Sequence, residues 1–300
     1  MLVKREWASS QGYDTGMPNY PTPSGSANLP LLTLPIARAL IGARDAGKSC
    51  IDCSLDLGRS TVMVQLQPDR WSWNDNSFPY PARCKDRTIY FWSGQQFEPA
   101  SSYSGSLIKL VPTEWGPPTF EIDGIKMLPT SKLSPYEDAR RKVELIEPGD
   151  KTILDTCGGL GYFAAWCLAG GARQIQSFEI NPGVLWLRGL NPWSPAAGGA
   201  LSLTPGDILP RSAEFAAQSF DAILHDPPRF GIAGDLYSQV FYGHLARLLK
   251  PRGRLFHYTG TPNKLTSRRD VPGEVAGRLQ RAGLTTRIEG DGILAIKTRA

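Results

Sequence analysis

The chain has 300 residues, 41% of them apolar, and a formal net charge of +5. This length and apolar content allow one large domain or two modest domains with a packed core. No run of about 18 apolar residues is present, which argues against a membrane-spanning helix, and the N-terminus lacks the charged-then-apolar pattern of a signal peptide. The five cysteines are few and odd in number, as is usual where thiols stay reduced. We therefore predict a cytoplasmic protein without a membrane partner.

The first part of the chain is interpreted as a flexible tail followed by a small β-rich domain. Residues 1–30 are polar and rich in Gly, Pro, Ser and Asn, a composition typical of disordered segments. Residues 31–128 contain a short helical pattern near 35–43 and then several short strand patterns separated by turns. Asp123-Gly124 lies between two of these patterns and predicts a tight hairpin turn. The tryptophans of this part are expected to fill its core.

Residues 42–49, Gly-Ala-Arg-Asp-Ala-Gly-Lys-Ser, match the phosphate-binding pattern G-x-x-x-x-G-K-S. That loop works only when a strand precedes it and a helix follows it. Here a helical pattern precedes the match and strand patterns follow it, so we interpret the match as accidental. Cys50 and Cys53 nearby form a single C-x-x-C pair. Because there is no second pair and no histidine close in sequence, no metal site is predicted.

Residues 129–300 are predicted to form one α/β domain. Ser134-Pro135, followed by two acidic residues, is typical of the start of a helix. Strand patterns alternating with helical segments then fall near 151–155, 175–179, 201–204, 221–225 and 254–258. Two final strand patterns, 284–289 and 292–298, are joined by Gly290-Asp291. We predict a Rossmann-like, seven-stranded sheet with a C-terminal antiparallel hairpin, preceded by the small β-rich domain.

A glycine-rich turn follows the first strand of this predicted sheet. Asp155 ends the strand, and Cys157, Gly158, Gly159 and Gly161 lead into a helix of small residues. Glycine lets the backbone turn sharply and approach a ligand without Cβ clashes. The unpaired N–H groups at the start of the helix suit a carboxylate.

Two more carboxylates follow the next strands of the predicted sheet. Glu179 ends the second strand, where it is able to accept both hydroxyls of a ribose, and Asp207 follows the third, where an adenine amino group needs an acceptor. Together with the glycine turn, these acids predict a site for a nucleoside with a positively charged amino-acid tail, which is S-adenosylmethionine (SAM). Ile180 and Ile208, next to the two acids, are assigned to the same site.

A dinucleotide site is the competing interpretation of the same turn. Residues 159–164 also fit G-x-G-x-x-A, with an acid about 20 residues further on. In dinucleotide folds, however, the glycines begin at the strand end, whereas Asp155 and two further residues intervene here. Asp207 and the predicted closing hairpin also favour the SAM site.

The fourth strand of the predicted sheet ends in Asp226-Pro227-Pro228. Its end faces the same crevice as the glycine turn. The prolines fix the backbone and leave carbonyls without competing N–H groups. A carboxylate beside a rigid carbonyl is able to accept both hydrogens of an amino group and to aim its lone pair at a methyl group on sulfur. We therefore predict Asp226, Pro227 and Pro228 as the catalytic residues, acting mainly by positioning.

Taken together, the glycine turn with Asp155, Glu179, Asp207 and Asp226-Pro-Pro resembles the motif set of class I SAM-dependent methyltransferases. The resemblance covers about residues 130–300 and implies SAM as cofactor. Asp-Pro-Pro is similar to the (Asp/Asn)-Pro-Pro-aromatic motif of amino-methyltransferases. Cys157 stands where many relatives have glycine, and Arg229 stands where the aromatic residue is expected, with Phe230 one position later. The whole chain also resembles a set of uncharacterised predicted methyltransferases best known in archaea.

A second resemblance is carried by residues 236–245 and 249–253, which look like the corresponding region of spermidine synthases. Those enzymes use the same sheet and also carry a small N-terminal β domain. They transfer an aminopropyl group rather than a methyl group. They need several carboxylates around the amine. Here only Asp226 and, farther on, Asp235 were expected near the fourth strand end, so aminopropyl transfer is the second interpretation.

The acceptor is not defined by the sequence. Arg229, Phe230, His257 and Tyr258 are the predicted substrate-pocket residues. Basic residues accumulate after Arg247, which slightly favours RNA over a small molecule or a protein side chain as the acceptor. A non-catalytic SAM-binding or RNA-binding protein is the alternative of another class.

Overall fold

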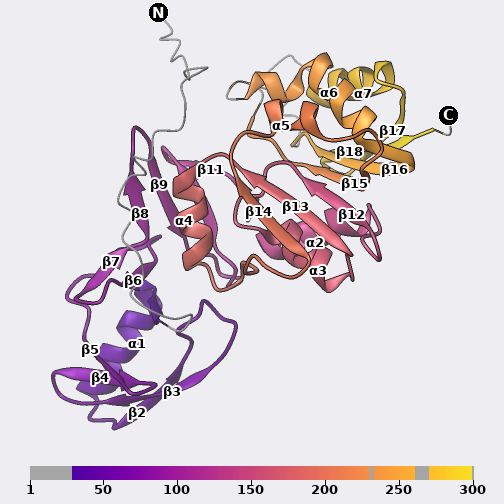
Figure 1. The fold of residues 1–300 in the computed structure, drawn as a ribbon. Coiled ribbons are helices and arrows are strands. Elements are labelled where there is room, and N and C mark those ends of the chain that lie inside the picture. The colour runs from indigo at the N-terminus through magenta and orange to yellow at the C-terminus, as the bar shows by residue number, and fades with distance from the viewer. Residues whose placement is uncertain (1–28, 230, 232, 261–269, 299–300) are drawn as a thin grey trace, which may run out of the picture.

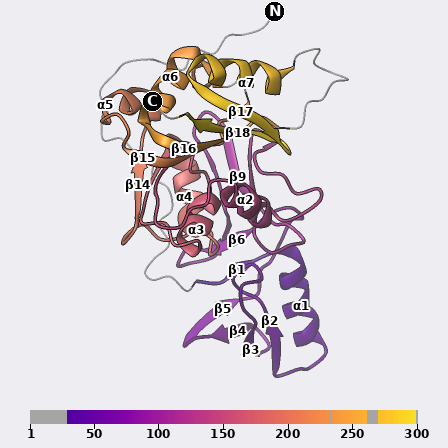
Figure 2. The ribbon, with the colours of Figure 1, turned by 90° about the vertical axis from the view of Figure 1, so that its right-hand side faces the viewer.

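The computed structural model describes residues 29–229, 231, 233–260 and 270–298. Figure 1 shows an N-terminal region of short strands beside a larger α/β layer structure, and Figure 2 shows the same two parts from the side. The predicted tail of residues 1–30 lies almost entirely outside the described residues, as does Phe230.

A seven-stranded mixed sheet forms the centre of the larger part. Its order is β14-β13-β12-β15-β16-β18-β17. The first five strands are parallel, and β18 runs antiparallel to both of its neighbours, β16 and β17. This confirms the predicted Rossmann-like sheet. The strands are β12 (Thr152–Asp155), β13 (Gln174–Glu179), β14 (Leu201–Pro205), β15 (Phe220–His225), β16 (Leu249–Tyr258), β17 (Leu284–Glu289) and β18 (Gly292–Lys297).

Helices cover both faces of this sheet, as Figures 1 and 2 show. Side chains alternate along a strand, so neighbouring Ile153 and Leu154 of β12 enter different cores. The core with Ile153 is closed by α2 (Pro135–Glu144), α3 (Tyr162–Ala169) and α4 (Pro182–Leu190). The core with Leu154 is closed by α5 (Ile208–Glu214), α6 (Gln239–Leu248) and α7 (Val271–Arg281), with the short 3-10 helix η1 (Gly234–Tyr237) before α6.

Within the described residues, the N-terminal region forms three small antiparallel sheets, with orders β1-β6-β7, β2-β3-β4-β5 and β11-β10-β9-β8. A core around Trp71, which is fully buried against Phe78, holds its outer part together. Its elements are β1 (Leu31–Leu32), α1 (Leu34–Asp45), β2 (Cys50–Cys53), β3 (Val62–Leu66), β4 (Arg70–Trp73), β5 (Asn76–Pro79), β6 (Tyr90–Trp92), β7 (Phe97–Pro99), β8 (Ser101–Tyr103), β9 (Leu107–Val111), β10 (Thr119–Ile122) and β11 (Ile125–Lys126).

The phosphate-loop-like segment of residues 42–49 begins in the last turn of α1 and ends directly before β2. The helix therefore precedes the segment and a strand follows it, which is the reverse of the order that phosphate binding requires. The structure thus agrees with the interpretation of this match as accidental.

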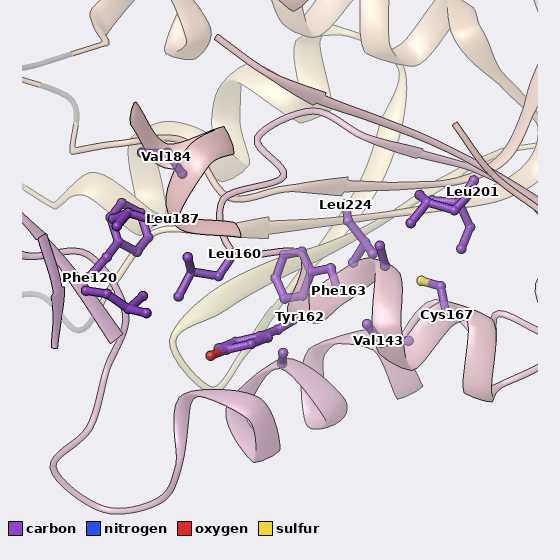
Figure 3. Close-up of a cluster of buried hydrophobic side chains, with 14 of the residues drawn as sticks. Phe120, Val143, Leu160, Tyr162, Phe163, Cys167, Val184, Leu187, Leu201 and Leu224 are labelled. Carbon is purple, nitrogen blue, oxygen red and sulfur yellow. The ribbon is translucent and has the colours of Figure 1, made fainter. Parts of the chain in front are cut away.

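The sheet formed by β8–β11 packs directly on the α/β part. Figure 3 shows Phe120 of β10 beside Leu187 of α4, and both belong to the same buried cluster as Leu160 of the glycine turn. Hydrogen bonds add to this contact, because the Tyr162 hydroxyl donates to the Pro118 carbonyl at 2.7 Å. One continuous core therefore crosses the predicted boundary at residues 128–129 and reaches the turn that follows β12.

Candidate functional site

The glycine turn after β12 has the backbone conformations that require glycine. Gly159 has φ +49° and Gly161 has φ +82°, values that side-chain-bearing residues rarely adopt. The Gly158 N–H donates to the Phe178 carbonyl at 2.7 Å, which ties the turn to the end of β13. Gly161 is the N-cap of α3, and no side chain caps the helix there. The first N–H groups of α3 are therefore not capped by a side chain, and they carry a partial positive charge at this point.

Asp155 ends β12 beneath this turn. Its side chain is fully buried, and its Oδ2 accepts a hydrogen bond from the Ser177 hydroxyl at 2.8 Å. Among the described residues nothing donates to its Oδ1. Burial raises the pKa of Asp155 to about 6, although Ser177 and Arg188 oppose this shift. A buried carboxylate with one free acceptor is suited to an ammonium group.

Glu179 ends β13 and already contacts the turn. Its Oε2 accepts from the Gly159 N–H and its Oε1 accepts from the Asn181 N–H, both at 2.9 Å. Burial raises the pKa of Glu179, and these two backbone donors counteract the rise. The adjacent Ile180 is 60% exposed, so its apolar side chain is available to pack against a planar ring.

Asp207 lies at the same edge of the sheet, after β14. Its Oδ1 accepts from the Leu209 N–H at 2.9 Å and caps α5, which leaves Oδ2 for a ligand. The Gly206 N–H donates to the Glu179 carbonyl at 2.9 Å, so the ends of β14 and β13 are joined. Ile208 differs from its assignment to the cofactor site, since it is buried in the core with α5 and α6.

Asp226 follows β15, the strand that pairs with β12 on the side opposite β13. Its side chain is half-buried, and no described residue donates a hydrogen bond to it. Burial raises the pKa of Asp226 to about 6, while the nearby charge of Lys142 lowers it. Pro227 is buried, and the Pro228 carbonyl accepts from the Tyr237 hydroxyl at 3.1 Å. The prolines thus hold a free carboxylate at the end of β15.

The remaining predicted pocket residues lie in different environments. Tyr258, at the end of β16, is half-buried, and burial raises its pKa to about 12. Arg229 is exposed. His257 differs from the expectation that it lines the pocket, because it is fully buried. Its Nε2 lies 2.8 Å from the Tyr242 hydroxyl and its Nδ1 lies 2.8 Å from the Tyr258 carbonyl, so both ring nitrogens are used inside the fold.

A buried ammonium group, which the sequence reasoning missed, lies near Asp226. Lys142 of α2 is 4% exposed, and its Nζ lies 2.5 Å from Asp138 Oδ2 and 3.9 Å from Asp291 Oδ2. The same Nζ lies 3.9 Å from the centre of the Tyr258 ring. Asp138 and Lys142 have the i, i+4 spacing of an ion pair in the sequence, but nothing there indicates that Asp291 joins them.

Arg188 of α4 was also missed. It is 4% exposed and is the one charged residue in the apolar segment Pro182–Leu190. A lone charge in such a helix is a signal that the sequence did contain. Its guanidinium lies behind the glycine turn, next to the Ser177 hydroxyl at 3.4 Å.

The residues at this edge fit a nucleoside with a zwitterionic tail. The buried Asp155 has a free Oδ1, which suits the ammonium of such a tail, and the uncapped N-terminus of α3 suits its carboxylate. Asp155, Gly159 and Gly161 would hold the tail, and Glu179, Ile180 and Asp207 would hold the nucleoside. Within the described part of the chain, no group of three or more His, Cys, Asp or Glu side chains is arranged to hold a metal ion. None of the described helices is long and apolar enough to cross a membrane.

The sheet order and the carboxylates at its carboxyl edge define the class I SAM-dependent methyltransferase fold. A solved spermidine synthase, crystallised with the transition state analogue AdoDATO, shares this fold with a TM-score of 0.53. The two are 17% identical, over 66% of this chain and 72% of the synthase. At that identity the likeness concerns the fold alone.

No family model matches the chain. The uncharacterized protein MJ1233 of Methanocaldococcus jannaschii is 43% identical to it over 218 residues, which are 70% of this chain and 74% of that protein. The chain belongs to the family of that archaeal protein. Polyamine aminopropyltransferase 2 of Streptomyces coelicolor is 33% identical over 117 residues, which are 36% of this chain but only 21% of that enzyme.

Proposed function

We propose that the protein is a SAM-dependent methyltransferase that acts on a nitrogen atom. The observation that carries this proposal is Asp226, a carboxylate without a hydrogen-bond donor among the described residues, held by two prolines at the end of the strand next to the glycine turn. Such a group is placed for an acceptor that arrives beside the cofactor.

The chemistry divides between the cofactor and the chain. When bound, SAM supplies a methyl group on a positively charged sulfur. Transfer would form an N–C bond to the acceptor at the expense of the S–C bond, whose electron pair would remain on sulfur. Asp226 and the Pro227 carbonyl accept the hydrogens of the amino group and direct its lone pair. The surplus proton of the nitrogen then passes to Asp226 or to water. Positioning provides most of the rate in this scheme.

The experiment is incubation with methyl-labelled SAM and a lysate separated into RNA, protein and small-molecule fractions. We expect label in one fraction, formation of S-adenosylhomocysteine, and loss of both in Asp226→Ala while SAM still binds. Asp235→Ala is the matched control, because Asp235 is an exposed carboxylate in η1 nearby along the chain. Unchanged turnover in Asp226→Ala removes Asp226 from the mechanism. SAM binding without S-adenosylhomocysteine in any fraction favours a non-catalytic protein.

Aminopropyl transfer is the second candidate, and one specific observation favours it. The negative charges of Asp138, Asp226 and Asp291 gather around a single resident ammonium, Lys142. Such a cluster suits an aliphatic amine. The partial similarity to the Streptomyces aminopropyltransferase supports the same alternative. Decarboxylated SAM with a diamine tests this alternative. An aminopropylated product, with no methyl transfer from SAM, would replace the first proposal by the second.

A further inference from the structure

Arg188 packs against the glycine turn on the side of α4. A Cβ atom built on Gly161 would lie 2.6 Å from the Arg188 Cζ and 2.7 Å from its Nε and Nη2. A Cβ on Gly158 would lie 3.0 Å from its Nη1. These two glycines therefore make room for a guanidinium behind the turn, in addition to allowing its sharp bend.

The charge of Arg188 is poorly compensated inside the protein. Its Nη1 donates to the Ser177 hydroxyl at 3.4 Å, and its buried Nε and Nη2 have no hydrogen-bond partner among the described residues. No carboxylate among the described residues lies within ion-pair distance of the Arg188 guanidinium. Burial lowers the pKa of Arg188, while Asp155 and Glu179 raise it, and arginine stays protonated at such sites. A buried charge without a full set of partners is costly, so a protein that keeps one has a use for it.

A second positive group faces the same turn. Gly161 begins α3 without a side-chain cap, so the first N–H groups of the helix add their partial charge on the ligand side. The negative counterpart is Asp155, whose Oδ1 also has no partner in the described chain. The turn is thus flanked by a buried cation and a buried anion, each with unused hydrogen-bonding capacity. This charge pair matches the carboxylate and the ammonium of an amino-acid tail.

We propose that Arg188 makes the site selective for SAM that retains its carboxylate, against decarboxylated SAM. The inference rests on the proposed SAM site and deepens it. The tail of SAM carries one positive and one negative group, whereas the tail of decarboxylated SAM carries only the ammonium. A fixed positive charge behind the turn attracts the first tail and opposes the second. Because Arg188 Nε and Nη2 are shielded from solvent, Arg188 is a positioning residue that acts across Gly161 through weakly screened electrostatics.

Calorimetry with SAM, decarboxylated SAM and 5′-methylthioadenosine tests the proposal. We expect the wild-type protein to bind SAM at least tenfold more tightly than decarboxylated SAM, which is about 1.4 kcal/mol. Arg188→Gln should bring the ratio close to one, and Arg188→Lys, which keeps the charge, should preserve most of it. Methylthioadenosine has no amino-acid tail, so its affinity should stay within about twofold of the wild type in every folded variant, as an order-of-magnitude expectation. Arg173→Gln is the matched control, since Arg173 is an exposed arginine at the opposite edge of the sheet.

The outcomes separate the proposals. A ratio that Arg188→Gln leaves unchanged, with methylthioadenosine binding intact, overturns the role of Arg188. If Arg188→Gln does not fold, the wild type still decides, because equal affinity for the two cofactors contradicts selectivity. Preference for SAM without methyl transfer to any acceptor would defeat the proposed activity but leave the role of Arg188 standing. Methyl transfer with equal affinities would do the reverse.

Discussion

The Nζ atom of Lys142 lies 3.9 Å from the centre of the Tyr258 ring, so an ammonium group of the protein itself rests on an aromatic face near Asp226. Asp138 contacts the same Nζ from the same helix, α2, and Asp291 contacts it from the turn between β17 and β18. This buried lysine offsets part of the negative charge that gathers beside the β15 end. It therefore lowers the pKa of Asp226 and so the pH at which this carboxyl ionises.

Lys142→Met should make the protein need a higher pH for transfer. The positive charge of Lys142 lowers the pKa of Asp226, so its removal raises that pKa further above the present value of about 6. We expect the acid side of the kcat profile to move upward by about one pH unit, with a roughly fivefold loss at pH 6 and little loss at pH 9. Lys126→Met, an exposed lysine that donates to Thr130, is the control. An unmoved profile would show that Lys142 is not coupled to Asp226.

The pH profile of the wild type should itself report Asp226. With a pKa of about 6, this carboxyl is protonated below pH 6 and no longer accepts the amino hydrogens. Hence kcat at saturating SAM should fall about tenfold per pH unit below 6 and level off above 7. Asp226→Asn should lower kcat by about 10²–10⁴ and remove this dependence. Retention of the acid limb in the asparagine variant would assign it to another group.

The positions of most strands followed from the sequence because buried parallel strands are short apolar runs between turn residues. The start of β16 did not. It begins at Leu249, five residues before the expected 254, because Pro251, Arg252 and Gly253 looked like turn residues. Arg252 has φ +64°, and the pairing with β15 shifts register there. The strand therefore continues through an irregular segment whose sequence is typical of a turn.

The residues of the candidate site were likewise only partly predictable from the sequence. Asp155, Glu179, Asp207 and Asp226 were predictable because each ends or follows a strand, and parallel strands bring their carboxyl ends to one edge. Asp138, Lys142 and Asp291 come from a helix and a hairpin turn, whose approach depends on how α2 packs against the sheet. Asp235, which the sequence places farther on from the same strand end, is exposed in η1. Contacts between elements that are far apart in the chain have no characteristic residue spacing, so the sequence pattern does not predict them.

Gly161→Ala and Gly159→Ala should differ sharply. Both positions have positive φ, which costs alanine about 1 kcal/mol. At Gly161 the added Cβ would also meet the Arg188 guanidinium at 2.6 Å, whereas at Gly159 the nearest atom is Phe120 Cε1 at 3.9 Å. We expect urea unfolding to show a loss of about 2–4 kcal/mol for Gly161→Ala and about 1 for Gly159→Ala. Adding Arg188→Ala should relieve part of the first loss but none of the second. Equal costs at both glycines would contradict the contact.

Asp155→Asn should stabilise the protein without cofactor and weaken SAM binding. Burial raises the pKa of Asp155 from 3.8 to about 6, so the folded state holds a proton that the unfolded state has released between these values. Wild-type stability therefore falls as pH rises from 4 to 6 and stays reduced above it. Asparagine keeps an acceptor for Ser177 and avoids the buried charge, so urea unfolding at pH 8 should show a gain of about 1–3 kcal/mol that shrinks toward pH 4. SAM affinity should fall at least about tenfold, because the ammonium loses its partner. Asp150→Asn, at an exposed carboxylate, should change neither quantity. A gain of the same size at pH 4 and pH 8 would show that the charge of Asp155 is not its source.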